Sequence, residues 1–251
     1  MLAIERRSEI MSLLEQNQSV LVAELSKLFN VTEETIRRDL EKLEKEGFAE
    51  KTYGGAVLRQ AVNLDIPFRV RERANKEGKH IIAQKALALV EDGDTIMLDS
   101  SSTVLGIARG LKRRKHVTVI TNSIEVLIEL ASAPELTVIS TGGTLRGHSL
   151  SLVGRNAERM LRNFNVDKAF ISCKGLDPDK GITESNEQEV EIKRAMCAAA
   201  KTTYIAADST KFNKVSFVKL ADLRDIDGII TEHPPSTTWQ ETFRANNIET
   251  H

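Results

Sequence analysis

One amphipathic helix is encoded by the stretch Val31-Thr-Glu-Glu-Thr-Ile-Arg-Arg-Asp-Leu-Glu-Lys-Leu-Glu-Lys-Glu-Gly47, and the first part of the chain is organised around it. Thr32 is a favourable N-cap residue, and the two glutamates that follow it suit the first turn of a helix. Apolar side chains then recur at helical spacing and define a single inward face: Ile36, Leu40 and Leu43. Gly47 provides a stop at the C-terminal end.

Two shorter helical patterns precede this helix, and a hairpin follows it. The predicted elements are helices over residues 4–16 and 22–29 and strands over residues 48–51 and 56–58. Asn30-Val31 forms the tight turn before the third helix, and Gly54-Gly55 forms the tip of the hairpin. Three short helices and a hairpin are too small for the core of an enzyme. They are the parts of a winged helix-turn-helix.

The helix over Val31–Gly47 is the second helix of the helix-turn-helix. In such a motif this helix lies in the major groove of DNA, so its outward side chains meet phosphates and base edges. Arginine can form two hydrogen bonds with a guanine, whereas lysine contacts phosphate as a point charge. The candidates for DNA contact are therefore on the helix and the hairpin: Thr35, Arg37, Arg38, Lys42, Lys51 and Tyr53. An alternative stays open, in which Glu34–Arg38 and Arg37–Glu41 are ion pairs on a solvated face.

The charge of the chain excludes a protein that coats DNA without specificity. The 251 residues include 35 lysines and arginines against 36 aspartates and glutamates. Residues 1–60 alone carry nine basic and eleven acidic side chains, so positive charge is confined to one edge of the helix and to the hairpin. We expect one copy of the winged helix-turn-helix, the DNA-binding head (residues 1–58), to bind DNA only weakly without a specific sequence. Specific binding then needs paired heads, which predicts a homodimer or homotetramer assembled mainly by the rest of the chain.

Several function classes are excluded by composition. No apolar run approaches the 18 residues that a membrane span requires, and the start of the chain lacks the apolar stretch of a signal peptide. Cys173 and Cys197 lie in apolar surroundings, and we expect buried, reduced thiols in a cytoplasmic protein. The five histidines have no metal-ligand spacing. We therefore expect no metal and no cofactor.

The larger part of the chain alternates between helical and strand patterns. The predicted strands cover residues 95–99, 117–121, 137–141, 168–173, 203–207 and 228–231, each but the last directly preceded by a predicted helix. Apolar strands separated by helices indicate βαβ units and a parallel sheet with helices on both faces. The predicted domains are a winged helix-turn-helix over residues 1–58, a linker over residues 59–75 and an effector-sensing and oligomerisation domain over residues 76–251.

Small polar residues follow the ends of several of these strands. A parallel sheet brings the carboxyl ends of its strands to one edge, where ligands bind, and a helix that begins there adds about +0.5 charge for an anion. The candidates for effector contact are Asp99, Ser101, Ser102, Thr103, Asn122, Gly142, Gly143, Lys174, Asp208 and Lys211. Hydroxyls, an amide and glycines that allow close approach suit a phosphorylated polyol. Each has a structural alternative as a helix cap, a turn or a loop cap.

A sugar-phosphate isomerase is the competing function. It needs a carboxylate base and an electrophile that stabilises the enediolate. Glu189 and Lys193, one helical turn apart, have the chemistry for both roles. They are also spaced for a simple ion pair, or for contact with a sugar hydroxyl without chemistry. We expect no enzymatic activity.

Both parts of the chain resemble the DeoR-type bacterial transcription regulators. The resemblance rests on Val31–Gly47 and Tyr53-Gly-Gly-Ala56 in the first part. In the second part it rests on Asp99–Thr103, Thr121-Asn122, Gly142-Gly143, Asp167-Lys-Ala-Phe170 and Asp208–Lys211. Lys51 and Tyr53 stand where the family usually has Arg and His, and Ser101 stands where it usually has Gly.

The resemblance implies a sensor domain similar in fold to ribose-5-phosphate isomerases and coenzyme A transferases. It also implies a regulator that binds a phosphorylated sugar and then loses affinity for operator DNA. We therefore expect a repressor of a carbohydrate-utilisation operon, with an activator of the same family as the alternative. Effector binding is expected to reorient or order the segment between the two domains.

Overall fold

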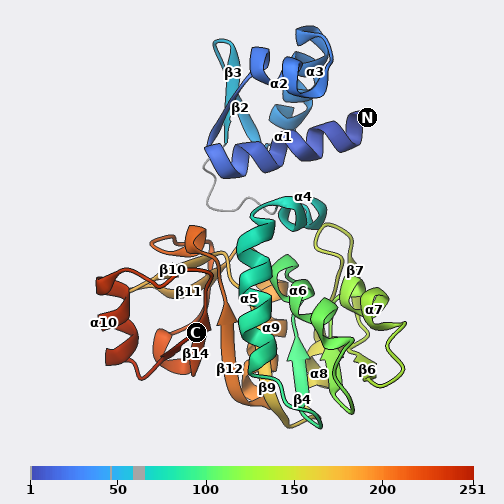
Figure 1. Cartoon of the computed structure of the whole chain (residues 1–251), viewed down its shortest axis with the longest axis vertical. Helices are drawn as coiled ribbons and strands as arrows, with labels where there is room; N and C mark the ends of the chain where they lie inside the picture. Colours follow the sequence, from blue (N-terminus) through green and yellow to red (C-terminus); the bar gives the residue numbers. More distant parts are fainter. Residues whose placement is uncertain (1, 46, 59–65) are drawn as a thin grey trace. The chain divides into compact units, whose positions relative to one another are not determined.

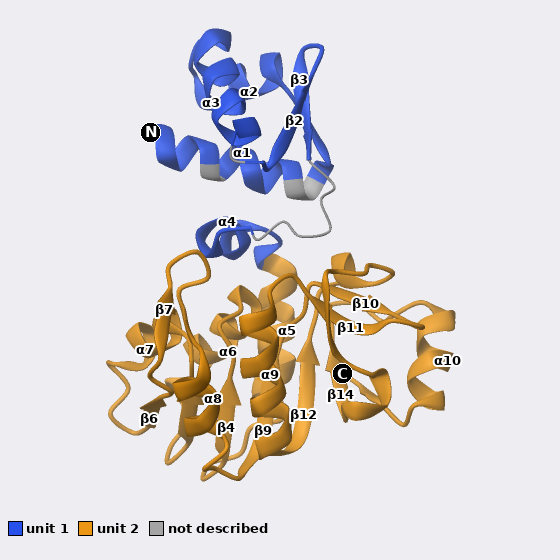
Figure 2. Ribbon diagram, turned by 180° about the vertical axis from the view of Figure 1, so that it is seen from behind, with its two compact units in different colours: residues 1–76 blue, residues 77–251 orange. Residues whose placement is uncertain are grey.

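The structure is a computed structural model that describes residues 2–45, 47–58 and 66–251. The chain divides into two compact units, residues 1–76 and residues 77–251 (Figure 2). Each unit has its own buried core.

The first unit is a winged helix-turn-helix, as predicted. It contains α1 (Ala3–Asn17), α2 (Val22–Phe29), α3 (Glu33–Lys45) and a three-stranded sheet of β1 (Ser19–Leu21), β3 (Gly55–Leu58) and β2 (Ala49–Thr52). The inward face of α3 joins side chains of α1 and α2 in the core: Ile10, Leu14, Leu25, Ile36, Leu40 and Leu43. Strand β1 was not predicted. It pairs antiparallel with β3, and a Cβ on Gly55 would lie 2.1 Å from the Val20 carbonyl oxygen. Only glycine permits that approach.

The predicted linker contains a helix, α4 (Phe68–Arg73), that belongs to the first unit. Val70 of α4 is buried in the core of that unit, and its carbonyl oxygen accepts a hydrogen bond from Ser12 Oγ at 3.4 Å. Arg73 Nη1 also donates to Glu9 Oε1 at 2.8 Å. A six-residue helix with four charged side chains has too few apolar positions to show periodicity. The first part of the predicted linker, residues 59–65, lies outside the described residues.

The second unit is built on a seven-stranded sheet in the order β15-β14-β12-β9-β4-β5-β6, and every pair of neighbours is parallel. The strands are β4 (Thr95–Leu98), β5 (Thr118–Thr121), β6 (Thr137–Ser140), β9 (Val166–Ile171), β12 (Ala200–Ala206), β14 (Gly228–Ile230) and β15 (Glu249–Thr250). The predicted parallel α/β fold is thus confirmed. Of the seven strands of this sheet, the two-residue edge strand β15 was not predicted.

Helices cover both faces of this sheet. They are α5 (Lys76–Ala88), α6 (Ser102–Leu111), α7 (Ile124–Leu130), α8 (Arg155–Leu161), α9 (Glu187–Ala199) and α10 (Thr237–Ala245). Views from opposite sides show α5 and α6 on one face and α8 and α9 on the other (Figures 1 and 2). Among the described residues, no helix is long and apolar enough to cross a membrane.

Short antiparallel strands, none of them predicted, complete the second unit. One hairpin joins β7 (Thr144–Arg146) to β8 (Ser151–Val153). A separate sheet contains β10 (Gly175–Asp177), β11 (Gly181–Glu184) and β13 (Val218–Ala221). These segments mix apolar residues with polar ones, and no helical pattern separates β7 from β8 or β10 from β11 as it separates the strands of the parallel sheet, so the sequence does not mark them as strands.

Candidate DNA-reading and effector sites

The predicted DNA contacts form the outer surface of the first unit. Arg37, Arg38 and Lys42 of α3 are exposed, and Thr35 is half-buried at the start of the helix. On the hairpin, Lys51 is exposed and Tyr53, at the tip, is fully exposed. The structure therefore presents all six side chains on the elements that the sequence analysis assigned to them.

Three cations of this surface, Arg37, Arg38 and Lys51, are paired with glutamates of α3. Arg37 Nη2 contacts Glu33 at 2.6 Å, and Arg38 Nε contacts Glu34 at 3.3 Å. Of the two expected ion pairs, Glu34–Arg38 forms and Arg37–Glu41 does not: Arg37 pairs with Glu33, and Glu41 pairs with Lys51 Nζ at 3.1 Å. Exposed pairs of this kind contribute less than about 1 kcal/mol each. DNA phosphates can therefore displace the glutamates at little cost.

A buried ion pair beneath this surface fixes α3 against α1. Asp39 Oδ2 accepts Arg6 Nε at 2.5 Å, and Asp39 Oδ1 accepts Arg7 Nη1 at 3.3 Å. The side chains of Arg6 and Asp39 are 8% and 5% exposed. The sequence did not reveal this pair, because the partners lie more than thirty residues apart.

The predicted effector contacts all follow the carboxyl ends of five adjacent strands. In the order of the sheet, Asp208 and Lys211 follow β12, Lys174 follows β9, Asp99 to Thr103 follow β4, Asn122 follows β5, and Gly142 and Gly143 follow β6. Parallel pairing aligns these ends, so the ten residues lie along one edge of the sheet. The edge is the feature that the sequence analysis predicted.

At the centre of this edge, Asp99 shapes the turn into α6. Its Oδ1 accepts the backbone N–H of Ser101 at 2.9 Å, and its Oδ2 accepts that of Ser172 at 2.9 Å. Ser101 is the N-cap of α6, since its Oγ accepts the N–H of Val104 at 3.1 Å. Ser102 and Thr103 are buried in the first turn of the helix. The turn is thus held rigidly at the position predicted for a phosphate.

The outer residues of the edge have structural roles of their own. Gly143 has a φ of +112°, and a Cβ there would lie 2.7 Å from the Val153 carbonyl oxygen, so the turn itself requires glycine. Asp208 caps a short 3-10 turn by accepting the N–H of Thr210 at 3.0 Å. Burial works to raise the pKa of Asp208, but the charge of Lys211 and the hydrogen bonds from Thr210 lower it, so the carboxylate is charged at neutral pH.

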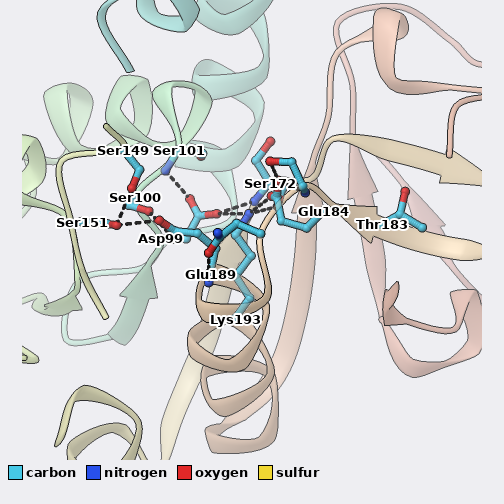
Figure 3. Close-up of polar contacts among 12 residues, drawn as sticks. Asp99, Ser100, Ser101, Ser149, Ser151, Ser172, Thr183, Glu184, Glu189 and Lys193 are labelled. Carbon is cyan, nitrogen blue, oxygen red and sulfur yellow. Dashed lines mark hydrogen bonds and ion pairs between the residues drawn. The ribbon is translucent and has the colours of Figure 1, made fainter. Parts of the chain in front are cut away.

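A fully buried charge cluster lies behind the edge (Figure 3). Lys193 Nζ of α9 donates to the Ser172 carbonyl oxygen at 2.7 Å, contacts the Glu184 carboxylate and lies 3.3 Å from Asp99 Oδ2. Burial disfavours both charges, yet the attraction between the partners outweighs it, so the pKa of Glu184 falls to about 2 and that of Lys193 rises. Sequence reasoning missed Glu184 and Ser172.

The spacing of Glu189 and Lys193 does not produce the ion pair considered above. Glu189 instead accepts Ser100 Oγ at 3.1 Å and Ser151 Oγ at 2.6 Å. Its nearest cation in the described part of the chain is Arg146, whose Nη1 lies 3.7 Å from Glu189 Oε1. Lys193 is held by other partners, so the two groups are not arranged as a base with an adjacent electrophile.

No group of three or more His, Cys, Asp or Glu side chains among the described residues is placed to hold a metal ion. Both cysteines are free thiols. Burial raises the pKa of Cys173 to about 12 and that of Cys197 to about 11, so both stay protonated at neutral pH.

Comparison with known families matches both units. A model of the DeoR-like helix-turn-helix domain matches residues 6–62, and a model of the DeoR C terminal sensor domain matches residues 74–233. The chain belongs to the DeoR family of transcriptional regulators. It is accordingly a sequence-specific DNA-binding regulator of transcription, as the sequence analysis predicted.

Curated relatives span nearly the whole chain. The chain is 43% identical over 232 residues to the uncharacterized HTH-type transcriptional regulator YulB of Bacillus subtilis, covering 92% of this chain and 90% of the relative. It is 34% identical to the putative aga operon transcriptional repressor of Escherichia coli O157:H7, with 98% and 92% covered. It is also 34% identical to the L-fucose operon activator of Haemophilus influenzae, with 96% of each chain covered.

Solved structures give weaker likenesses. Ribose 5-phosphate isomerase A of Methanocaldococcus jannaschii is 19% identical with a TM-score of 0.42 over 55% of each chain. The eIF2B delta subunit of Chaetomium thermophilum is 16% identical with a TM-score of 0.49, over 64% of this chain and 57% of that one. Neither likeness bears on function.

Proposed function

We propose that this regulator represses a carbohydrate-utilisation operon and releases its operator when the second unit binds a phosphorylated sugar. The observation that carries the proposal is the alignment of ten polar or glycine residues at the ends of five adjacent strands, beside the start of α6. Relatives whose names include the aga operon and the L-fucose operon support a sugar-linked role. Because one of these two is a repressor and the other an activator, the sign of regulation belongs to the proposal.

On the DNA side, α3 enters the major groove with Thr35, Arg37, Arg38 and Lys42, and Lys51 and Tyr53 contact the flanking backbone. One head offers few contacts, so two or more copies bind repeated half-sites as a homodimer or homotetramer. Such a regulator acts in the cytoplasm, where operator DNA lies.

On the effector side, the phosphate sits at Ser101, Ser102 and Thr103, where backbone N–H groups and the helix dipole favour an anion. Asp99 holds this turn in shape through its hydrogen bonds. The polyol lies among the remaining candidates, Asn122, Gly142, Gly143, Lys174, Asp208 and Lys211.

The site binds and does not catalyse. A base for isomerisation would be Glu189, but this carboxylate is engaged by two serine hydroxyls, and Lys193 is committed to Glu184 and Asp99. A turnover assay with ribose 5-phosphate tests the point. Isomerisation by the wild-type protein that disappears in Glu189→Gln would overturn a purely sensory role.

Signal transfer runs through α4. This helix packs on α1, and α1 holds α3 through Asp39. Only two residues separate α4 from α5, and the charge of Lys79 on α5 contributes to lowering the pKa of Asp208 in the effector site. A change at Asp208 can therefore reach the recognition helix along the chain, through α5, the two residues before it and α4.

The decisive experiment is a fluorescence anisotropy titration with an operator selected by the protein from random-sequence DNA. A panel of sugar phosphates is then added to the complex, and one member is expected to release the DNA. Ser102→Asp places a carboxylate where the phosphate should bind, so this variant should need a far higher effector concentration. Ser132→Asp, an exposed position after α7, is the matched control. Release of Ser102→Asp at the wild-type concentration would show that the phosphate site is wrong.

A further inference from the structure

One end of the effector site carries two hydrogen-bond acceptors beside a single cation. Asn122 is only 1% exposed, and its Nδ2 donates to the Leu152 carbonyl oxygen at 3.2 Å. That bond fixes the orientation of the amide, because a carbonyl oxygen can only accept. Asn122 Oδ1 consequently points away from Leu152, and it has no hydrogen-bond partner in the described part of the protein. A buried acceptor without a partner is costly unless a ligand supplies a donor.

The second acceptor is the carboxylate of Glu189, which is 6% exposed. Figure 3 shows Glu189 close to both Ser100 and Ser151, whose hydroxyls donate to its two oxygens. Ser100 directly precedes Ser101, the N-cap of α6, so Glu189 contacts the residue next to the proposed phosphate position. Each carboxylate oxygen can accept a further hydrogen bond.

The donor at this end is Arg146, which no sequence pattern assigned to the site. It ends β7, and its Nη1 donates to Ser149 Oγ at 3.0 Å. The 3.7 Å between Nη1 and Glu189 Oε1 exceeds a hydrogen bond, so the two charges face each other without direct contact.

The hairpin that carries Arg146 is a fixed wall of the site. The N–H of Leu152 donates to the Asn122 carbonyl oxygen at 2.7 Å, and the N–H of Ile124 donates to the Leu150 carbonyl oxygen at 2.9 Å. These bonds attach β8 to the end of β5, next to Asn122. The guanidinium is therefore preorganised opposite Glu189.

We propose that Asn122, Arg146 and Glu189 form a hydroxyl-reading subsite that takes the polyol end of the effector and rejects a second phosphate. A hydroxyl both donates and accepts, so it satisfies Asn122 Oδ1 or Glu189 while accepting from Arg146. A phosphate has acceptor oxygens and negative charge, so it leaves Asn122 Oδ1 without a donor and is repelled by the Glu189 carboxylate, whose charge offsets the attraction of Arg146. This inference rests on the proposed function, and it narrows the effector to a monophosphate with free hydroxyls at the end remote from the phosphate.

The test is isothermal titration calorimetry on the full chain with paired probes. The pairs are fructose 6-phosphate and fructose 1,6-bisphosphate, glucose 6-phosphate and glucose 1,6-bisphosphate, and ribose 5-phosphate and ribose 1,5-bisphosphate; inorganic phosphate probes the anion end alone. A monophosphate that binds is expected to bind at least tenfold more tightly than its bisphosphate. Glu189→Gln removes the repulsive charge, so the ratio of the two dissociation constants should fall about tenfold. Arg146→Lys should weaken the monophosphate about tenfold and leave the affinity for inorganic phosphate unchanged.

The matched control is Glu191→Gln, on the same helix, whose carboxylate pairs at the surface with Arg194 at 2.7 Å. It should leave every constant at the wild-type value. If the bisphosphate binds as well as the monophosphate, or if Glu189→Gln and Arg146→Lys both behave like the control, the subsite is overturned while the proposed function stands. Binding of a monophosphate without release of operator DNA would instead overturn the proposed function and leave the subsite intact. If no phosphorylated sugar binds the wild-type protein, both fail.

Discussion

Asp39→Asn is expected to loosen the recognition helix more than any surface change on it. The substitution preserves the volume of the side chain but removes the charge that Arg6 and Arg7 contact at 2.5 Å and 3.3 Å. The guanidinium of Arg6, only 8% exposed, then stays buried without a carboxylate. Removing one partner of a buried ion pair costs about 3–5 kcal/mol. That is a large share of the roughly 5–15 kcal/mol that stabilises a whole domain.

Hydrogen exchange of the full chain, read by mass spectrometry, measures this loss where it occurs. Trp239, the one tryptophan, lies in the second unit and does not report on the head. Every 1.4 kcal/mol is tenfold in an opening constant, so amides of α3 should exchange about 10²-fold to several 10³-fold faster. Operator affinity should fall with the fraction of heads that are closed, while peptides of α9 serve as an internal reference.

Glu34→Gln is the matched control for this experiment. It breaks the Arg38–Glu34 pair, whose side chains are 77% and 64% exposed, so it should cost at most about 0.5 kcal/mol and change exchange about twofold. Equal protection of α3 in Asp39→Asn and Glu34→Gln would refute the view that the buried pair fixes the helix.

Three other outcomes are expected. Burial would raise the pKa of Glu184, but the attraction of Lys193 outweighs it and lowers the pKa from 4.5 to about 2. The contribution of this carboxylate to the free energy of unfolding, about 3 kcal/mol, is therefore complete above pH 4.5 and is lost as the pH falls toward 2. Calorimetry across this range should show a loss of stability in acid that is smaller in Glu184→Gln. Gly143→Ala should lower the free energy of unfolding of the second unit by about 1–3 kcal/mol, because the backbone has a positive φ there and the added Cβ would meet the Val153 carbonyl oxygen. Urea titrations followed by Trp239 fluorescence measure this change. Gly147→Ala, which has open space around the added Cβ, is the control and should match the wild type. Arg73→Ala removes the contact of α4 with Glu9, so it should reduce the release of operator at saturating effector while leaving the effector dissociation constant unchanged. Arg224→Ala, at an exposed site of the second unit, is the control. Equal release of operator in both variants would argue against signal transfer through α4.

The sequence predicted what depends on local periodicity. The inward face of α3, the Gly54-Gly55 hairpin and six of the seven parallel strands follow from spacing and turn chemistry within single segments. The site edge was also predictable, because parallel pairing necessarily aligns the carboxyl ends of β4, β5 and β6. Strand β1 and helix α4 were not predicted, because each is stabilised by contacts with a segment distant in sequence.

Interactions between distant segments account for what was missed at the sites. Asp39 had no predicted partner, and the fold places Arg6 of α1 beside it. Lys193 had a plausible partner in Glu189, but in the structure it contacts Glu184 and Asp99. Asn122 Oδ1 is left without a partner among the described residues because Asn122 Nδ2 donates to the Leu152 carbonyl oxygen. Leu152 lies in a hairpin that was not predicted from the sequence. Ion pairs and amide orientations across the fold are set by tertiary structure, which one sequence does not encode in any local pattern.

The near-neutral charge of the head follows the same principle and limits how the protein can use DNA. Residues 1–60 carry two more acidic than basic side chains, and the acidic side chains include the glutamates that pair with Arg37, Arg38 and Lys51. Each such cation must exchange a carboxylate for a phosphate or a base, so part of the electrostatic gain is cancelled for any DNA sequence. What remains favourable is the hydrogen bonding that only a matching sequence offers. A head built this way gains affinity from fit and from the presence of a second head, and both are lost if α3 shifts against α1. The buried Asp39 pair and the contact of α4 with α1 are therefore the points at which a modest change of conformation has the largest effect on operator binding.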